Sequence, residues 1–166
     1  MTLTATDTRL ELEARFSQAV SESFSLAAGL DAEQIPVESQ TRHTERMVST
    51  VATAMGEGWI GSLALLVPAE GADRIARAVL SRGGDERLRG AEIAQAMGDL
   101  LARVTLNFGD AFADEESVTM GPPTTVTGDR LSVAFPWSQD FETRLCFRSI
   151  PTDFWAVLRL SHHRPV

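Results

Sequence analysis

The longest stretch of the sequence with a single hydrophobic period runs from Gly90 to Phe112. No proline interrupts it, and roughly six turns of an α-helix fit within it. Apolar residues recur at spacings of three and four, as they do along one face of a helix. These residues are Ile93, Met97, Leu100, Leu101, Val104, Phe108, Ala111 and Phe112. We therefore predict a long helix that buries this stripe in the core.

The opposite side of the predicted helix is more polar. It carries Glu92, Gln95, Asp99, Ala102 and Arg103, with Asn107 placed on the same side. One interpretation is a solvated surface on which Asp99 and Arg103 form an ordinary ion pair four residues apart. The other is a face that presents a carboxylate, an amide and a cation to a binding partner.

Other segments predict further elements on either side of this helix. Residues 8–11 have the form of a capping box, so a first helix is expected to run from there to about Ala28, followed by a loop over residues 31–40. Residues 45–55 and 59–67 flank a Gly-Glu-Gly break and predict an antiparallel hairpin. A short helix is expected over residues 72–81. Five strands are expected after the long helix, over residues 117–120, 124–127, 131–137, 143–150 and 154–160.

This order of elements predicts an α+β fold, with helices packed on a face of an antiparallel β-sheet. The 166 residues fit one domain, with tails expected at residues 1–7 and 161–166.

Composition narrows the class of protein and of partner. The chain has 15 Lys plus Arg against 23 Asp plus Glu, a net charge of -8, which argues against nucleic acid as a partner. There is no run of about 20 apolar residues and no leader with a charged start, so we expect a cytoplasmic protein with no membrane partner. Cys146 is the only cysteine, which excludes an intrachain disulfide.

Familiar catalytic and ligand-binding motifs are missing from the sequence. The three histidines, His43, His162 and His163, do not have the spacing of a metal site. The pair Gly83-Gly84 lacks the lysine and the preceding strand of a phosphate loop. No G-x-S-x-G pattern marks a nucleophile. We therefore expect the chain to bind no metal and no cofactor of its own.

The segment Ala96-Met97-Gly98-Asp99-Leu100 resembles the A-x-G-E-L sequence of the CheC, CheX and FliY group of chemotaxis phosphatases. The long helix of that group reads approximately A-x-G-E-L-x-N-x-I-x-G-N, and Val104 and Asn107 match its later positions. Residues 123–128 resemble the group's P-x-V-x-G segment with one extra residue, and residues 58–65 its G-x-x-G strand. These similarities imply a CheX-like domain with a single site.

The resemblance also implies a partner, and it identifies two departures from the group's pattern. In this group the glutamate and the asparagine three residues later face a phosphorylated receiver domain, and any Mg²⁺ belongs to that receiver. The acid pairs with a receiver lysine, and the amide orients the attacking water. Here Asp99 replaces the glutamate and Ala102 the asparagine. A methyl group cannot hold a water, and losing such a polar group typically slows a reaction about 10²- to 10³-fold. Phosphatase activity is therefore expected to be weak or lost.

Other interpretations of the helix remain open. Glu92 and Gln95 repeat the acid-amide spacing, on a site displaced by about 10 Å along the axis. The face can also dock a receiver without chemistry. A third hypothesis is that the chain is a regulatory module that associates with copies of itself, for example as a homodimer. On the first helix, Glu22 and Ser25 do not repeat the acid-amide pair, so no second site is expected.

Overall fold

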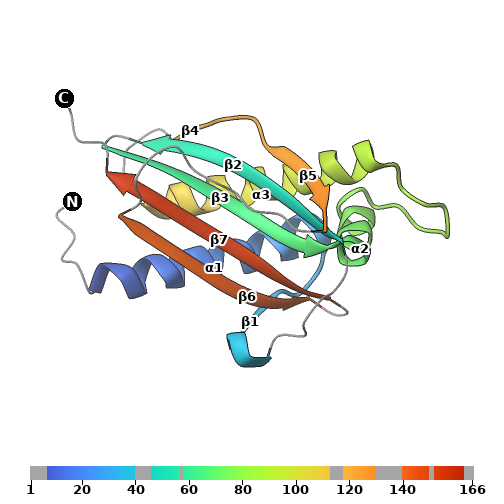
Figure 1. Cartoon of the computed structure of the whole chain (residues 1–166), viewed down its shortest axis with the longest axis horizontal. Coiled ribbons are helices and arrows are strands. Elements are labelled where there is room, and N and C mark those ends of the chain that lie inside the picture. The colour runs from blue at the N-terminus through green and yellow to red at the C-terminus, as the bar shows by residue number, and fades with distance from the viewer. Residues whose placement is uncertain are drawn as a thin grey trace.

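One antiparallel β-sheet forms the front layer of the molecule, and its helices lie on one face of it (Figure 1). The structure, a computed structural model, describes residues 7–39, 46–56, 58–112, 118–129, 140–149 and 152–162. The described residues confirm the predicted α+β fold, with helices packed on an antiparallel sheet.

The described sheet has seven strands in the order β1-β6-β7-β3-β2-β4, and β5 also pairs with β2. Every pairing is antiparallel. The predicted hairpin is confirmed, because Met47 pairs with Pro68 and Gly56 with Trp59. The strands are β1 (Glu33–Ile35), β2 (Met47–Gly56), β3 (Trp59–Pro68), β4 (Thr119–Met120), β5 (Thr124–Gly128), β6 (Phe141–Ser149) and β7 (Thr152–His162).

The helices in the described residues are α1 (Asp7–Ala28), α2 (Ala69–Val79), α3 (Gly90–Phe112) and a short 3₁₀ turn, η1 (Val37–Ser39). Helix α3 has the bounds that the hydrophobic period predicts. Helix α2 begins three residues earlier than predicted, because Pro68 ends β3 and serves directly as the helix N-cap. A proline is compatible with this boundary because the first helical N–H groups need no intrahelical acceptor.

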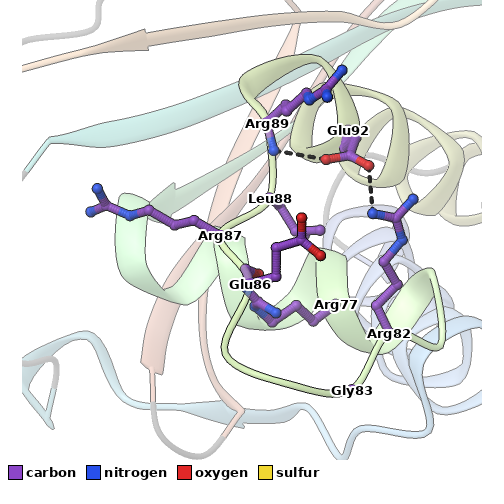
Figure 2. A pocket seen from close by; sticks show the side chains of 8 residues that line it. All are labelled: Arg77, Arg82, Gly83, Glu86, Arg87, Leu88, Arg89 and Glu92. Carbon is purple, nitrogen blue, oxygen red and sulfur yellow. Dashed lines mark hydrogen bonds and ion pairs between the residues drawn. The ribbon is translucent and has the colours of Figure 1, made fainter.

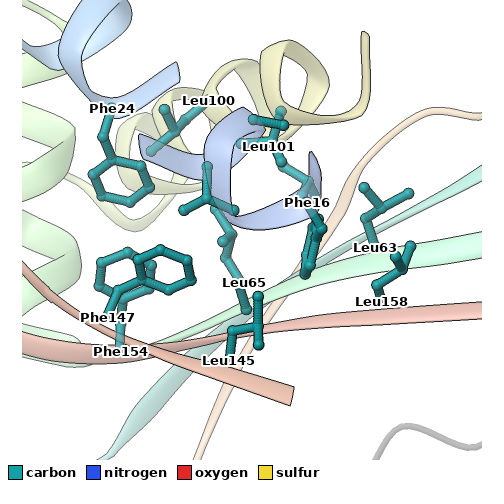
Figure 3. Packing of buried hydrophobic residues seen from close by; sticks show 14 of the residues in the cluster. Phe16, Phe24, Leu63, Leu65, Leu100, Leu101, Leu145, Phe147, Phe154 and Leu158 are labelled. Atoms are coloured by element: carbon teal, nitrogen blue, oxygen red, sulfur yellow. The ribbon is translucent and has the colours of Figure 1, made fainter. Parts of the chain in front are cut away.

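The core lies between the helices and the sheet (Figure 3). Phe154 of β7 stacks on Phe24 of α1 with ring centroids 4.7 Å apart and on Phe147 of β6 at 5.4 Å. Phe16 of α1 meets Phe108 of α3 edge-on at 5.8 Å. The contact of Phe24 with Phe154 therefore joins α1 to the sheet, and the contact of Phe16 with Phe108 joins α3 to α1. Each buried ring also removes a large apolar surface from water.

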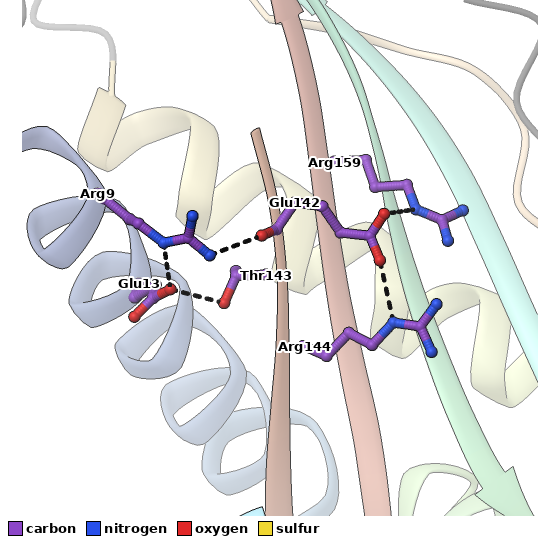
Figure 4. Close-up of polar contacts among 6 residues, drawn as sticks. All are labelled: Arg9, Glu13, Glu142, Thr143, Arg144 and Arg159. Carbon is purple, nitrogen blue, oxygen red and sulfur yellow. Dashed lines mark hydrogen bonds and ion pairs between the residues drawn. The ribbon is translucent and has the colours of Figure 1, made fainter. Parts of the chain in front are cut away.

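Polar contacts hold the first turns of α1 against strand β6 (Figure 4). Arg9 donates to the backbone oxygen of Glu142 at 3.1 Å, and Thr143 donates to the carboxylate of Glu13 at 2.9 Å. On β6, Glu142 accepts from both Arg144 and Arg159. Burial raises the pKa of Glu142, but these two arginines outweigh it and keep the pKa below its usual value.

Several predicted boundaries are wrong. Residues 31–40 were expected to form a loop, yet Glu33–Ile35 form β1, because the edge of β6 provides hydrogen-bonding partners that the sequence pattern does not show. Thr8 lies inside α1 rather than before it. At the other end, β7 continues to His162, and Ser161 is buried, so this part of the expected tail belongs to the sheet. The predicted strand 131–137 lies outside the described residues.

Candidate functional site

Helix α3 has a buried side and an exposed side, as its hydrophobic period predicts. Met97, Leu100, Leu101 and Val104 are fully buried against the sheet and α1. On the other side Gln95, Asp99 and Arg103 are exposed, and Ala102 is half-buried. Within the described residues, neither Asp99 nor Arg103 forms an ion pair, so the ordinary pair considered from the sequence is not present.

Glu92 has a different role from the rest of this face. Its Oε2 accepts a hydrogen bond from the backbone N–H of Arg89 at 2.8 Å, which is the acidic half of a capping box. Its Oε1 lies 2.6 Å from a guanidinium nitrogen of Arg82. The hydrogen bond from Arg89 lowers the pKa of Glu92, with Arg82 adding to the effect. The carboxylate therefore helps to start α3, and the alternative site built on Glu92 and Gln95 lacks a free acid.

The segment around Asp99 is placed by the strand that follows α3 in the chain. Gly98 lies beside Pro123, and a Cβ atom on Gly98 would meet Cβ of Pro123 at 3.4 Å, an ordinary van der Waals distance. Pro123 leads directly into β5, and Thr125 on β5 bonds to Thr50 of β2 at 3.0 Å. The two segments that resemble the chemotaxis group, residues 96–100 and 123–128, are thus neighbours in space.

Leu106 extends the exposed face by one turn, and it was not among the residues predicted for this face. Its side chain is 49% exposed, and it follows Asp99 and Ala102 at the spacing of one helix face. The sequence does indicate this exposure. Leu106 is two residues from both Val104 and Phe108, which belong to the buried stripe, so the helical period places it on the opposite side. We define the α3 face as the residues Gln95, Asp99, Ala102, Arg103 and Leu106.

Asn107 does not belong to the α3 face. Its amide donates a 2.9 Å hydrogen bond to the hydroxyl of Ser23 on α1, and Ser23 is completely buried. Asn107 is half-buried, and its amide is engaged at the contact between α1 and α3, so this amide is not offered to a partner. Its amide joins two helices.

The remaining candidate groups form no reactive site in the described residues. No cluster of three or more histidine, cysteine or acidic side chains able to hold a metal occurs there. Cys146 is buried on β6, and burial raises the pKa of its thiol. His43 and His163 lie outside the described residues. No helix in the described ranges combines the length and the apolar character needed to cross a membrane.

Comparison with known proteins identifies the fold. No protein-family model matches the sequence, and no curated protein matches it. Chemotaxis protein CheX from Vibrio vulnificus superimposes with a TM-score of 0.75 at 16% identity, over 96% of this chain and 100% of that chain. A CheC-like superfamily protein from a Shewanella species gives 0.71 at 17% identity, over 92% of this chain and 98% of that one. The chain therefore has a CheC/CheX-like fold.

A third similar structure includes a partner. The CheX-CheY-BeF₃-Mg²⁺ complex from Borrelia burgdorferi matches with a TM-score of 0.65 at 12% identity, over 93% of this chain and 98% of that chain. At this identity the similarity establishes the shared CheC/CheX-like fold, and the CheY partner is a property of the Borrelia protein.

Proposed function

We propose that this protein binds a phosphorylated receiver domain of bacterial chemotaxis or two-component signalling through the α3 face, with weak or no phosphatase activity. The observation that carries the proposal is the position of Asp99, which is exposed on α3 in a CheC/CheX-like fold and has no ion pair within the described residues. A structural neighbour solved together with CheY supports a receiver as the kind of partner.

Asp99 and Arg103 supply the charges of the proposed contact. The carboxylate of Asp99 pairs with a lysine of the receiver, and the guanidinium of Arg103, one turn away, pairs with an acidic group. Leu106, half exposed on the same side, supplies apolar area at the end of the contact. Mg²⁺, where the reaction needs it, is held by the receiver.

The lack of an amide at position 102 limits the chemistry. Hydrolysis of an acyl phosphate needs a group that holds a water in line with the phosphorus. Ala102 has no such group. We therefore expect the protein to bind the phosphorylated receiver but to accelerate its dephosphorylation only weakly or not at all. Gln95 is exposed one turn before Asp99 and is the amide best placed to support any residual hydrolysis.

The test measures binding and dephosphorylation separately, with a phosphorylated receiver from the same organism. We expect saturable binding that Asp99→Ala weakens, with little acceleration of phosphate release. Ala102→Asn should raise the rate of release about 10²-fold or more, since it supplies the missing amide. Gln95→Ala tests whether Gln95 supports any residual hydrolysis, and it should lower the residual rate if it does. A receiver that fails to bind at all would contradict the proposal.

Self-association is a separate property that the same samples can report. Light scattering of the free chain measures its mass, and a homodimer whose mass is unchanged by Asp99→Ala would use a surface other than the α3 face. If the dimer dissociates in Asp99→Ala, the face is an interface between copies of this chain, and the receiver proposal is wrong.

A further inference from the structure

A pocket of about 330 Å³ lies between the end of α2 and the start of α3 (Figure 2). The connecting segment, residues 80–89, forms one wall and the first turn of α3 the other. The pocket is lined by Arg77, Arg82, Gly83, Glu86, Arg87, Leu88, Arg89 and Glu92. Leu88 is the only large apolar side chain in this lining, so the pocket favours a polar ligand.

The connecting segment is fixed in place by its own contacts. Arg77 on α2 binds Asp73 at 2.8 Å, donates to the backbone oxygen of Gly84 at 3.0 Å and also donates to the backbone oxygen of Glu86. Leu88 is buried with Ala76 of α2 and Ala96 of α3. The pocket is therefore preformed by an anchored loop, which lowers the conformational entropy that a ligand would have to overcome.

Arginine dominates the charge of the pocket. Four guanidinium groups line it against two carboxylates, Glu86 and Glu92, on a protein whose net charge is -8. Within the described residues, Arg77 and Arg82 have ion-pair partners, whereas Arg87 and Arg89 have none. Guanidinium groups bind phosphate through paired hydrogen bonds, which makes arginine the usual residue for this ligand.

Glu92 shows where an anion is favourable in this pocket. Figure 2 shows its carboxylate between the backbone N–H of Arg89 and the guanidinium of Arg82, at the first turn of α3. The positive end of the helix dipole and the two arginines stabilise negative charge at this point. The carboxylate of Glu92 neutralises part of this positive charge. Arg82 uses only part of its guanidinium on Glu92, and Arg89 has no ion pair in the described residues, so these two keep donors for a second anion. Figure 2 shows the side chain of Arg87 directed away from them.

We infer that this pocket binds a phosphate group, carried either by inorganic phosphate or by a small phosphomonoester. The lining offers guanidinium donors and a preformed polar wall, but no aromatic or extended apolar surface to hold a nucleotide base. The inference is independent of the receiver proposal, because the arginines that carry it are not part of the α3 face.

Calorimetric titration of the full chain with sodium phosphate, at constant ionic strength, tests the inference. We expect one saturable site. Arg82→Gln and Arg89→Gln should each weaken binding by about tenfold or more, since each removes charged hydrogen-bond donors. Arg74→Gln is the matched control, because Arg74 is exposed on α2 but does not line the pocket. Titration with phenyl phosphate then separates a phosphomonoester from inorganic phosphate.

Glu92→Gln gives a test of opposite sign. Glutamine still accepts the hydrogen bond from the backbone of Arg89, but it removes a negative charge from the pocket, so phosphate affinity should rise. Loss of affinity in this variant would overturn the inference. It is also overturned if neither phosphate compound saturates a site, or if Arg74→Gln weakens binding as much as Arg89→Gln. If the arginine variants weaken receiver binding but leave phosphate binding unchanged, the pocket is a contact for a protein partner, and the inference of a phosphate site is wrong.

Discussion

Two side chains on α3 that the sequence places together have different roles in the structure. Glu92 and Asp99 are acids two turns apart on one helix, and from the sequence each was a candidate to meet a partner. Glu92 caps the helix and pairs with Arg82, whereas Asp99 is exposed and has no ion pair in the described part of the chain. Individual contacts, not residue type, separate a structural acid from an available one.

Glu92 should make the stability of the protein sensitive to acid. Its pKa is lowered in the folded state, so it contributes stability above its unfolded pKa, and this is lost as the pH falls through the folded pKa. Glu92→Gln should therefore destabilise the protein at neutral pH and have less effect at about pH 3. Urea unfolding of both proteins at the two pH values measures this. An equal loss of unfolding free energy at both pH values would show that the charge of Glu92 does not contribute to stability.

Two glycines of α3 provide a matched pair of substitutions. A Cβ on Gly98 would contact Pro123 at an ordinary 3.4 Å, whereas a Cβ on Gly109 would lie 2.9 Å from a methyl carbon of Val118. Both changes to alanine favour the helix by up to about 1 kcal/mol. Gly98→Ala should therefore stabilise the protein, and Gly109→Ala should be less stable than Gly98→Ala. Thermal unfolding followed by circular dichroism gives the order, and the reverse order would contradict the close approach of Val118 to Gly109.

At the scale of whole elements, α3 works as a wall of the core and as a surface at the same time. Its apolar stripe packs on the sheet and α1, while the α3 face is directed outward. Substitutions on the two sides should consequently affect different measurements.

Asn107→Ala and Asp99→Ala should separate stability from binding. The first removes the hydrogen bond to Ser23 and leaves a buried hydroxyl without this donor, at a cost of about 1 kcal/mol. Asp99 is exposed, so its replacement should change stability by less than about 0.5 kcal/mol. Receiver binding should follow the opposite order, with only Asp99→Ala weakening it. Chemical unfolding and a binding titration on the same variants check both expectations.

At the scale of the whole molecule, one hydrophobic cluster includes residues of α1, α3 and the central strands. Phe154 is completely buried in it and contacts rings from α1 and β6. The two long helices therefore share their core with the sheet, and a second, smaller cluster of Ala76, Leu88 and Ala96 lies between α2 and α3.

The described elements should unfold in a single transition. Circular dichroism, which reports the helices, and tryptophan fluorescence, to which Trp59 and Trp155 on the sheet contribute, should give the same midpoint in urea. Phe154→Ala should lower the free energy of unfolding by about 3–5 kcal/mol and shift both signals together. Separate midpoints would show that the chain contains more than one cooperative unit.

Elements with a local pattern could be predicted from the order of residues alone. The period of α3 and the hairpin of β2 and β3 follow from residues close together in the chain, because burial on one side imposes a spacing of three and four on a helix and of two on a strand. The exposed position of Asp99 follows from the same period.

Contacts between distant segments became visible only in the folded chain. The amide of Asn107 is engaged by Ser23, which lies 84 residues away in the chain, and residues 33–35 become a strand because β6 lies beside them. The pocket between α2 and α3 likewise requires two helices and the loop between them to be folded together. Such contacts depend on which surfaces pack together. The periodicity within one segment shows which side is buried but does not identify the segment that packs against it.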